Sequence, residues 1–537
     1  MVTLHVDWIS ATKLSLQGNK SMTCVNCSKK AAIVVGTVTA ITLLITVLLL
    51  ILYGTFDRLV ERMIHESVVI TPTSSVYSNW VSPDTPIYFS IYLFNITNHE
   101  DIERGAKPRI EQIGPYGKSR EDEHHVAKGR SFSVGDPDKD IVIGISTPFV
   151  TLSANMEMGI GLSTNEYALM TIFMEPKLFV ETSVTEFLWG YVDPITDACN
   201  AFDSRKCPSH KVGVMFGKNG TADGPFVIDT GVNDITKLGN ILSYKGKSTV
   251  DVWSSDEANQ IKGTDGSHVA PGLSMNSRRF IFAADLCRSF EMKVNGLGKL
   301  TNSDKLEVFS LAGTPETAQP ASVNPANKGY CPTLTPGPPC PPAGTFDLSS
   351  CRQQGGLRPP IYSSQPYFFG ADPALRDEVE GLPMPTADNA STKVFVEPRL
   401  GLVVEAYKRL QISAYVRPSK VMSEQFKNWT KPTFIPVVWF EEKAVAGADA
   451  LEVLYTSVYE KPNYGRRIVL ITMVVFVGLL FILLVTLAIL LFQICHQNSR
   501  TGEAIKSGAV NAPGVGMFDA KYTKVAAANP NSGRVEA

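Results

Sequence analysis

Two long apolar runs lie near opposite ends of this 537-residue chain, from Ile33 to Tyr53 and from Ile468 to Ile494. Each run exceeds the roughly 20 residues that a helix needs to cross a bilayer, and neither contains an acidic or basic side chain. Because a helix satisfies its own backbone polar groups in hydrocarbon, each run is predicted to form a transmembrane helix. The chain is therefore expected to be a membrane hairpin that encloses one domain of about 410 residues.

Charge predicts which side of the membrane this domain occupies. Four lysines lie in the tail of residues 1–30 and five basic residues lie in the tail of residues 495–537, so the positive-inside rule places both tails in the cytoplasm. Arg466 and Arg467 lie on the opposite side of the second apolar run and argue against this orientation, but charges beside a long translocated domain weigh less in that rule. We expect transmembrane helices at residues 31–53 and 468–494, and a lumenal or extracellular domain at residues 54–467. The first helix is too long for a cleaved signal and is interpreted as a signal anchor.

Cysteine usage agrees with this topology. Six cysteines lie between the spans, and an even set in an oxidising compartment predicts three disulfides among Cys199, Cys207, Cys287, Cys331, Cys340 and Cys351. The other three, Cys24, Cys27 and Cys495, lie beside the membrane on the predicted cytoplasmic side. Juxtamembrane cysteines are candidates for S-palmitoylation, and inert thiols are the alternative.

Four acceptor sequons between the spans predict N-linked glycans at Asn95, Asn219, Asn389 and Asn428. Two further matches, at Asn19 and Asn26, fall on the predicted cytoplasmic side and are interpreted as chance.

Signs of catalysis, metal binding and nucleic-acid binding are missing from the sequence. The formal net charge is −2, and no basic stretch is dense enough to indicate nucleic acid. The chain has no Gly-x-Ser-x-Gly elbow, no His-Glu-x-x-His pair and no phosphate-binding loop. The adjacent His124 and His125 would point to opposite faces of a strand, so joint metal ligation is not expected. We therefore expect no enzyme and no cofactor beyond N-linked glycans.

Much of the domain alternates apolar and polar residues at period two, which predicts half-buried antiparallel strands. The clearest examples are residues 85–97, 392–396, 401–407 and 410–416. In the last of these, Leu410 and Ile412 fall on one face while Gln411 and Ser413 fall on the other.

Helical signals cluster at two places, residues 55–66 and residues 163–189. In the second, Ser163 with Glu166 and Ser183 with Glu186 have capping-box spacing, and Pro176 should interrupt any helix between them. Two short helices with a break are therefore predicted. Their many apolar residues fit either a buried core or a partly exposed cap that contacts a lipid or protein ligand.

Several short motifs occur together in a fixed order along the chain. They are Asn79-Trp80, Gly114-Pro115-Tyr116, Leu188-Trp189-Gly190-Tyr191 with Asp193-Pro194, Tyr244-Lys245-Gly246, Asp285-Leu286-Cys287-Arg288-Ser289, Ala371-Asp372-Pro373, Glu397-Pro398 with Gly401, and Pro436-Val437-Val438-Trp439. In this order, and between two spans, they resemble the class B scavenger receptor family.

This resemblance implies an α+β fold: a large antiparallel β-barrel-like ectodomain with an apical helical bundle, anchored by two transmembrane helices. It also implies an apolar tunnel that leads from the apex toward the membrane. Residues 163–189 would be the apex, with Phe173, Met174, Lys177, Leu178 and Phe179 as ligand-binding residues. Relatives that bind anionic particles carry several apical lysines, whereas this apex offers Lys177 between Glu175 and Glu181, so a neutral lipid or a protein partner is at least as well supported.

The resemblance also bears on the disulfides. Cys287 and Cys351 match a family pair, and Cys331 with Cys340 lies where relatives have a short-range bridge. Cys199 and Cys207 match no family position, and their close spacing suggests a local bridge.

The function expected from the resemblance is binding of a lipid or lipoprotein ligand and transfer of lipid to the membrane. One alternative is a trafficking receptor that carries a lumenal hydrolase on its apical helices, and another is an adhesion or structural glycoprotein that transports nothing. The sequence does not choose between plasma membrane and lysosomal or endosomal membrane. A ridge of Ala32, Gly36 and Ala40 could pack against the second span or against another copy, and Tyr522 with Val525 fits a tyrosine-based sorting motif.

Overall fold

The computed structural model describes residues 6–81, 85–120, 133–172, 174–207, 209–219, 221, 224–353, 356–422, 424 and 426–508. These residues form two compact units, which are described separately. One unit runs from Asp57 to Asn463, and the other comprises the described residues up to Phe56 and from Tyr464 onward.

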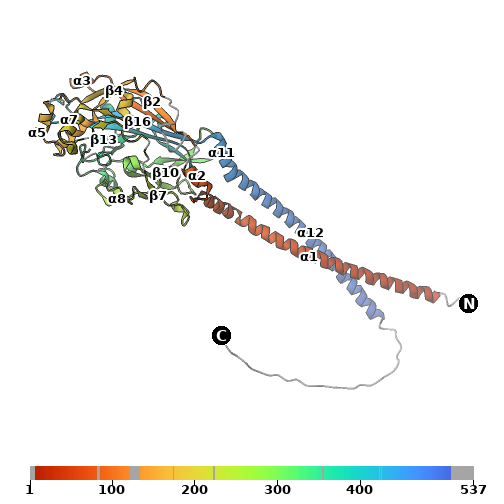
Figure 1. The fold of residues 1–537 in the computed structure, drawn as a ribbon. Helices are drawn as coiled ribbons and strands as arrows, with labels where there is room; N and C mark the ends of the chain where they lie inside the picture. The colour runs from red at the N-terminus through yellow and green to blue at the C-terminus, as the bar shows by residue number, and fades with distance from the viewer. Residues whose placement is uncertain are drawn as a thin grey trace, which may run out of the picture. The chain divides into compact units, whose positions relative to one another are not determined.

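A curled antiparallel sheet of ten strands forms the body of the Asp57–Asn463 unit (Figure 1). Its main path is, in order, β2 (Ile110–Arg120), β1 (Ile87–Ile96), β16 (Thr433–Val445), β15 (Leu402–Val416), β14 (Lys393–Glu397), β11 (Val308–Gly313), β10 (Arg288–Gly298) and β9 (Arg278–Ala283). β13 (Ile361–Ser364) also pairs with β15, and β12 (Thr345–Asp347) pairs with β13. The barrel-like domain expected from the sequence is confirmed as far as this curled sheet.

Two-stranded sheets and short helices surround the large sheet. The two-stranded sheets are β3 (Ile141–Ile145) with β4 (Phe179–Ser183), β5 (Tyr191–Val192) with β6 (Lys211–Val212), and β7 (Phe226–Ile228) with β8 (Ile241–Tyr244). The helices of this unit after the first are α2 (Ser75–Val81), α3 (His99–Glu103), α4 (Thr147–Glu157), α5 (Thr164–Thr171), α6 (Val184–Trp189), α7 (Pro194–Asp203), α8 (Asp256–Asn259), α9 (Pro373–Asp377), α10 (Ala387–Ala390) and α11 (Ala448–Tyr455). A π-helical turn, η8 (Thr456–Glu460), follows α11.

The longest strand, β15, replaces two strands that the sequence predicted separately. The polar pair Lys408 and Arg409 interrupted the apolar alternation and therefore suggested a break. In the structure Lys408 lies opposite Glu442 and Arg409 lies opposite Glu441 on β16, with ion-pair distances of 3.5 and 2.7 Å. Matched charges directly opposite one another stabilise a strand pair, so the strand continues through this point.

The polar face predicted for the second half of β15 is not exposed to solvent. Gln411 and Ser413 are fully buried, and the segment after β13, Pro366–Phe368, contacts β15 here. The Gln411 side-chain oxygen accepts a hydrogen bond from the Tyr367 backbone N–H at 2.7 Å, and its nitrogen donates to the Ser413 hydroxyl at 3.2 Å. The face that bears Gln411 and Ser413 is therefore buried, while Leu410 and Ile412 on the other face are half-buried, so the expectation that the polar face is exposed was wrong here.

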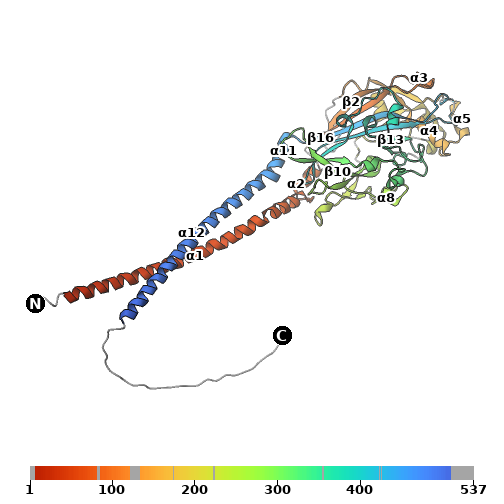
Figure 2. The same ribbon diagram turned by 180° about the vertical axis from the view of Figure 1, so that it is seen from behind.

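Helices gather at the end of this unit opposite α2 and α11, as both ribbon views show (Figures 1 and 2). α7 contacts both α4 and α5 there, and the buried side chains of the three helices join those of β1 and β16 in one core. The sequence did not predict α4 or α7. α4 is buried from Pro148 to Met156, so it lacks the polar stripe by which an amphipathic helix is recognised.

In the other unit, α1 (Val6–Val68) contacts α12 (Lys461–Gly508), with the Arg466 guanidinium 5.5 Å from the centre of the Tyr53 ring. Each helix contains a stretch long and apolar enough to cross a membrane. The buried side of α1 carries Ala32, Thr39, Thr42 and Thr46. Each threonine hydroxyl donates to the carbonyl four residues earlier, at 2.7 to 2.9 Å, so these polar groups are satisfied within the helix. Of the predicted ridge, Ala32 is buried and Ala40 is exposed, and packing through this ridge stays a prediction.

Candidate ligand-binding site

The segment predicted to bind ligand begins at α5, whose first turn is fixed by a capping box. The Ser163 hydroxyl accepts a hydrogen bond from the Glu166 N–H at 3.3 Å, and the Glu166 carboxylate accepts one from the Ser163 N–H at 2.7 Å. Lys206 also donates to Glu166 at 2.7 Å and, together with Ser163, lowers the pKa of Glu166 to about 2. The capping box predicted from the sequence is confirmed.

Two apolar side chains near the C-terminus of α5 face solvent. Leu169 is 53% exposed and Ile172 is 70% exposed, whereas Tyr167 and Met170 on the other side of the helix are buried in the core. Exposed aliphatic side chains of this size, side by side on one turn, are what a surface that contacts an apolar ligand or partner requires. The sequence did not single out these two residues, because periodicity alone could not say which apolar positions the core would cover.

The five residues that the sequence analysis assigned to ligand binding differ in their exposure to solvent. Lys177 is exposed and Met174 is half-buried, and Phe173 lies outside the described residues. Leu178 is 3% exposed and Phe179 is 9% exposed, so neither presents a surface to a ligand, and their assignment to the site was wrong.

The reason for this error is that the chain after Pro176 continues as a strand. Phe179 is the first residue of β4 and lies opposite Ile145 of β3, and the Ser146 N–H donates to the Leu178 carbonyl at 2.9 Å. This pairing turns both side chains into the core that α4 shares with β1. The predicted second helix does form, as α6, with Ser183 as its N-cap.

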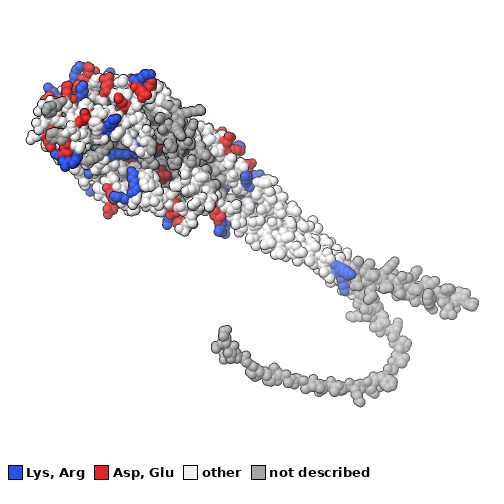
Figure 3. Space-filling model, in the orientation of Figure 1, with Lys and Arg blue, Asp and Glu red and all other residues white. Residues whose placement is uncertain are grey.

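The visible surface of the Asp57–Asn463 unit carries acidic and basic side chains interspersed, and neither sign covers a continuous field on the face shown in Figure 3. Electrostatic attraction of an extended anionic particle needs a surface dominated by basic groups. This face therefore fits a neutral ligand better than an anionic one.

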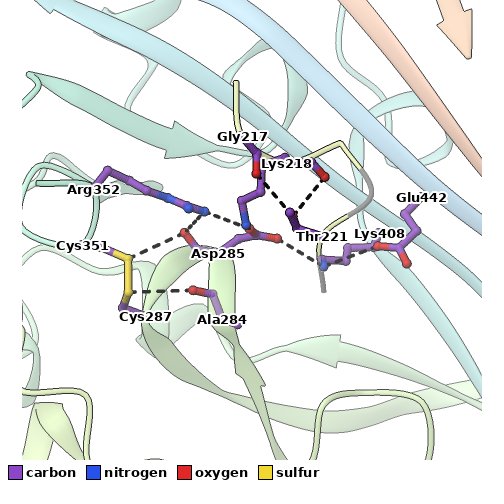
Figure 4. A network of polar contacts seen from close by, with 10 residues as sticks. All are labelled: Gly217, Lys218, Thr221, Ala284, Asp285, Cys287, Cys351, Arg352, Lys408 and Glu442. Atoms are coloured by element: carbon purple, nitrogen blue, oxygen red, sulfur yellow. Dashed lines mark hydrogen bonds and ion pairs between the residues drawn. A yellow bond between two sulfur atoms is a disulfide. The ribbon is translucent and has the colours of Figure 1, made fainter. Parts of the chain in front are cut away.

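A polar network centred on Asp285 holds five separate segments of the domain together (Figure 4). Arg352 donates through Nη2 to the Asp285 carboxylate at 2.8 Å and to its backbone carbonyl at 2.9 Å. Lys218 and Lys408 approach the same carboxylate at 3.7 and 3.9 Å, and Lys408 also pairs with Glu442. The network thus links the loop after β6, the turn between β9 and β10, the loop after β12, and strands β15 and β16.

The charges around Asp285 decide its protonation state. Burial raises the pKa of this carboxyl, but the positive charges of Lys408, Arg352 and Lys218 outweigh burial, and the pKa lies below its ordinary value. Asp285 therefore stays ionised in an acidic compartment. The sequence contained Asp285 within a recognised motif, but it gave no indication of the three cations, which come from distant parts of the chain.

Three disulfide bonds join Cys199 with Cys207, Cys287 with Cys351, and Cys331 with Cys340, the pairs expected from the sequence. The Cys287–Cys351 bond spans 64 residues and lies directly beside Asp285 (Figure 4). Covalent closure and the ion-pair network therefore fix the same turn.

A buried carboxylate anchors the segment that leads toward the second apolar stretch. Glu397, at the end of β14, is fully buried, and it accepts hydrogen bonds from the Tyr459 hydroxyl of η8 and from the Leu400 N–H. Burial and this carboxylate raise the pKa of Tyr459, so the phenol keeps its proton. A buried charge is stable only when its hydrogen bonds are made, so Tyr459 is held firmly to this turn.

Arg399, on the same turn, reaches α1. Its Nη2 pairs with Glu61 at 2.9 Å, and its Nη1 donates to the Val458 carbonyl at 2.8 Å. The turn closes at Gly401, whose φ of +73° favours glycine and where a Cβ would lie 2.0 Å from the Val269 carbonyl oxygen. The Glu397-Pro398 motif with Gly401 thus has a structural role that the sequence could not specify.

The four predicted glycan acceptors differ in accessibility. Asn219, Asn389 and Asn428 are exposed, whereas Asn95 is half-buried in β1 and its side-chain oxygen accepts a hydrogen bond from the Ile143 N–H at 2.8 Å. Glycosylation at each remains a prediction.

The candidate sites outside the domain are described only in part. Cys495 is an exposed free thiol on α12, and the side chains of Cys24 and Cys27 lie outside the described part of α1. Tyr522, Val525, His124 and His125 also fall outside the described residues. Among the residues that the structure does describe, no group of three or more histidine, cysteine or acidic side chains is arranged to hold a metal ion.

Comparison with known proteins places the chain in a family. The CD36 family model matches residues 38–488. Lysosome membrane protein 2 of Homo sapiens is 30% identical over 399 residues, which cover 70% of this chain and 78% of that protein. Scavenger receptor class B member 1 of Bos taurus is 27% identical over 450 residues, which cover 80% of this chain and 85% of that protein. Because the family model spans most of the chain, including the whole Asp57–Asn463 unit, the resemblance seen in the sequence is confirmed and the chain belongs to the CD36 family.

Proposed function

We propose that this chain is a two-pass membrane receptor whose Asp57–Asn463 unit lies outside the cytoplasm, binds a lipidic ligand and passes lipid to the membrane. The observation that carries this proposal is the family match, which runs from within the first apolar stretch into the second. The disulfides support the extracytoplasmic placement, because such bonds persist in oxidising compartments. Both tails would then be cytoplasmic.

The physical reason for a lipid route is the poor solubility of acyl chains and sterols. Exposure of apolar surface to water costs roughly 25 cal/mol per Å², so such a molecule needs a covered path between the aqueous side and the bilayer. We propose that the inside of the curled sheet provides this path as an apolar tunnel, and that the α5 surface with Leu169 and Ile172 is where ligand is received.

A second candidate function is transport of a partner protein, a lumenal hydrolase, to lysosomes or endosomes. The exposed pair Leu169 and Ile172 favours it, because aliphatic side chains on a short helix suit a protein interface as well as a lipid. Three relatives at 29 to 30% identity carry the name Lysosome membrane protein 2.

The proposal is tested by measuring the uptake of tritiated cholesteryl ester and fatty acid. The cells express the wild-type chain, the Ile172→Asp variant or the Val323→Asp variant. Both substitutions place a charge on an exposed residue, 70% exposed at Ile172 and 64% at Val323, so neither should disturb folding. We expect the wild-type chain and Val323→Asp to raise uptake several-fold and Ile172→Asp to raise it less at equal surface expression.

Uptake that is unchanged by the wild-type chain would count against lipid transfer. If in that case a lumenal hydrolase copurifies with the wild-type chain and with Val323→Asp but not with Ile172→Asp, the trafficking function replaces it. Phe179 is unsuitable for this experiment, since a charge at a buried position would unfold the domain.

A further inference from the structure

A polar pocket of about 290 Å³ lies on one face of the sheet where β14 pairs with β15. Lys393 of β14 lies opposite Tyr407 of β15, and Phe395 lies opposite Glu405, so these side chains share one face. Its volume is close to the lower limit for small-molecule sites. The pocket is separate from the α5 surface, and the lipid route proposed above makes no use of it.

The carboxylates that line the pocket are already committed to neighbours. Glu405 is buried and accepts hydrogen bonds from the Thr301 N–H and hydroxyl, both at 2.8 Å, and from the Tyr407 hydroxyl at 3.0 Å. Asp388 pairs with Lys393 at 2.6 Å. Both acids therefore already have partners, and the hydroxyl groups of Thr301 and Tyr407 both donate to Glu405.

The cations that line the pocket still have donors to offer. The Arg409 side chain is only 8% exposed, and its Nε donates to Glu441 at 2.7 Å while its Nη1 donates to the carbonyls of Asp388 and Ser391. Its Nη2 has no hydrogen-bond partner among the described residues. This nitrogen does not belong to the buried side-chain atoms that lack a partner, so it is open to solvent and is available to donate to an acceptor that enters the pocket.

A second cation reinforces this argument. Lys299 lines the same pocket, and within the described part of the chain its ammonium group has no ion-pair or hydrogen-bond partner. Lys299, Arg409 and Lys393 thus surround a space that has no uncommitted acid. A compact anion with several acceptor oxygens would accept from Arg409 and Lys299, and Lys393, although paired with Asp388, adds positive charge nearby. A guanidinium edge binds phosphate oxygens particularly well.

We propose that this pocket binds a phosphate monoester group, carried either by a soluble molecule or by a lipid headgroup. Arg409 and Lys299 contact the phosphate oxygens, Lys393 adds positive charge, and Phe395 lines the wall against the attached organic group. This site stands on its own geometry and does not depend on the apical surface or on a tunnel.

The test uses the full chain in micelles of a neutral detergent, with binding followed by calorimetry. The probes are glycerol 3-phosphate for the soluble source and lysophosphatidic acid for the lipid source, with glycerol and lysophosphatidylcholine as their matched controls. We expect at least one phosphate monoester to bind while its control does not. Equal affinity for both phosphates identifies a soluble ligand, and binding of lysophosphatidic acid alone identifies a lipid headgroup.

Lys299→Ala is the decisive variant, and Lys107→Ala is its control. Both lysines are exposed and have no side-chain partner among the described residues, so both variants should fold and unfold like the wild-type chain. Loss of one charge-assisted contact should weaken phosphate binding about tenfold in Lys299→Ala only. The proposal is overturned if neither phosphate binds, or if the two variants weaken binding equally.

Discussion

Replacement of Asp285 by asparagine tests whether the ion-pair network stabilises the domain. The change removes one charge, keeps the size of the side chain, and leaves Lys218, Arg352 and Lys408 facing a neutral amide. Exposed ion pairs contribute up to about 1 kcal/mol, whereas breaking a buried pair costs about 3–5 kcal/mol. The Asp285 side chain is 32% exposed, which places it between these limits, and we expect a loss of about 2–3 kcal/mol in the free energy of unfolding.

The expected change in melting temperature follows from the size of the domain. An unfolding entropy of about 2.1 cal/mol/K per residue over the roughly 400 residues of Asp57–Asn463 gives about 0.85 kcal/mol/K, so the melting temperature should fall by about 3 °C. Thermal unfolding of the full chain in detergent, followed by intrinsic fluorescence, measures this. The control is Asp101→Asn, which breaks a pair of similar length, 3.0 Å to Arg104, between side chains that are 60% and 70% exposed. It should lower the melting temperature by less than about 1 °C.

The pH dependence provides a further check. Since the pKa of Asp285 is lowered in the folded state, its contribution is complete above the ordinary aspartate pKa of about 4 and is lost as the pH falls through the lower, folded-state value. The difference between wild type and Asp285→Asn should therefore be the same at pH 7 and pH 5 and should shrink only below about pH 4. An unchanged melting temperature at pH 7, or a difference that has vanished by pH 5, would refute this account.

Two further experiments test the covalent features of the domain. Joint replacement of Cys287 and Cys351 by serine opens a loop of 64 residues. In the chain-entropy model this should lower the free energy of unfolding by about 4 kcal/mol, which chemical denaturation without reductant measures. Unchanged stability would show that the bond is not formed. Asn219→Gln should migrate faster than the wild-type chain on gels and should show a smaller shift after N-glycosidase treatment, because Asn219 is exposed on the side proposed to be lumenal; identical migration would contradict glycosylation there.

Local signals in the sequence were reliable where the deciding interactions are local. The capping box at Ser163 and the break at Pro176 each depend on residues within a few positions, and both occur as predicted. The strand pattern of β1 and the first half of β15 likewise depends on alternation alone. The two apolar spans needed only length and composition to be recognised.

Predictions were wrong where a distant segment decides the environment of a side chain. Phe179 looked like part of an exposed helical cap, but pairing of its strand with β3 buries it. Gln411 looked solvent-exposed because it is polar, but it is buried, and Tyr367, in the segment after β13, supplies its hydrogen bond. The cations around Asp285 and the partners of Glu397 come from segments far apart in the sequence, so no local pattern could reveal them.

The turn that bears Glu397 and Arg399 has a mechanical consequence. Glu397 binds Tyr459, which precedes the second apolar stretch. Arg399 binds both Val458 of that same segment and Glu61 of α1, the helix that contains the first apolar stretch. Tension applied to either membrane anchor is therefore delivered to the end of β14 through adjacent hydrogen bonds. Separation of the two apolar segments would break the bond from Tyr459 and leave the buried Glu397 carboxylate without a partner or water, which is costly. Lateral forces in the bilayer should therefore deform the sheet before they separate these segments.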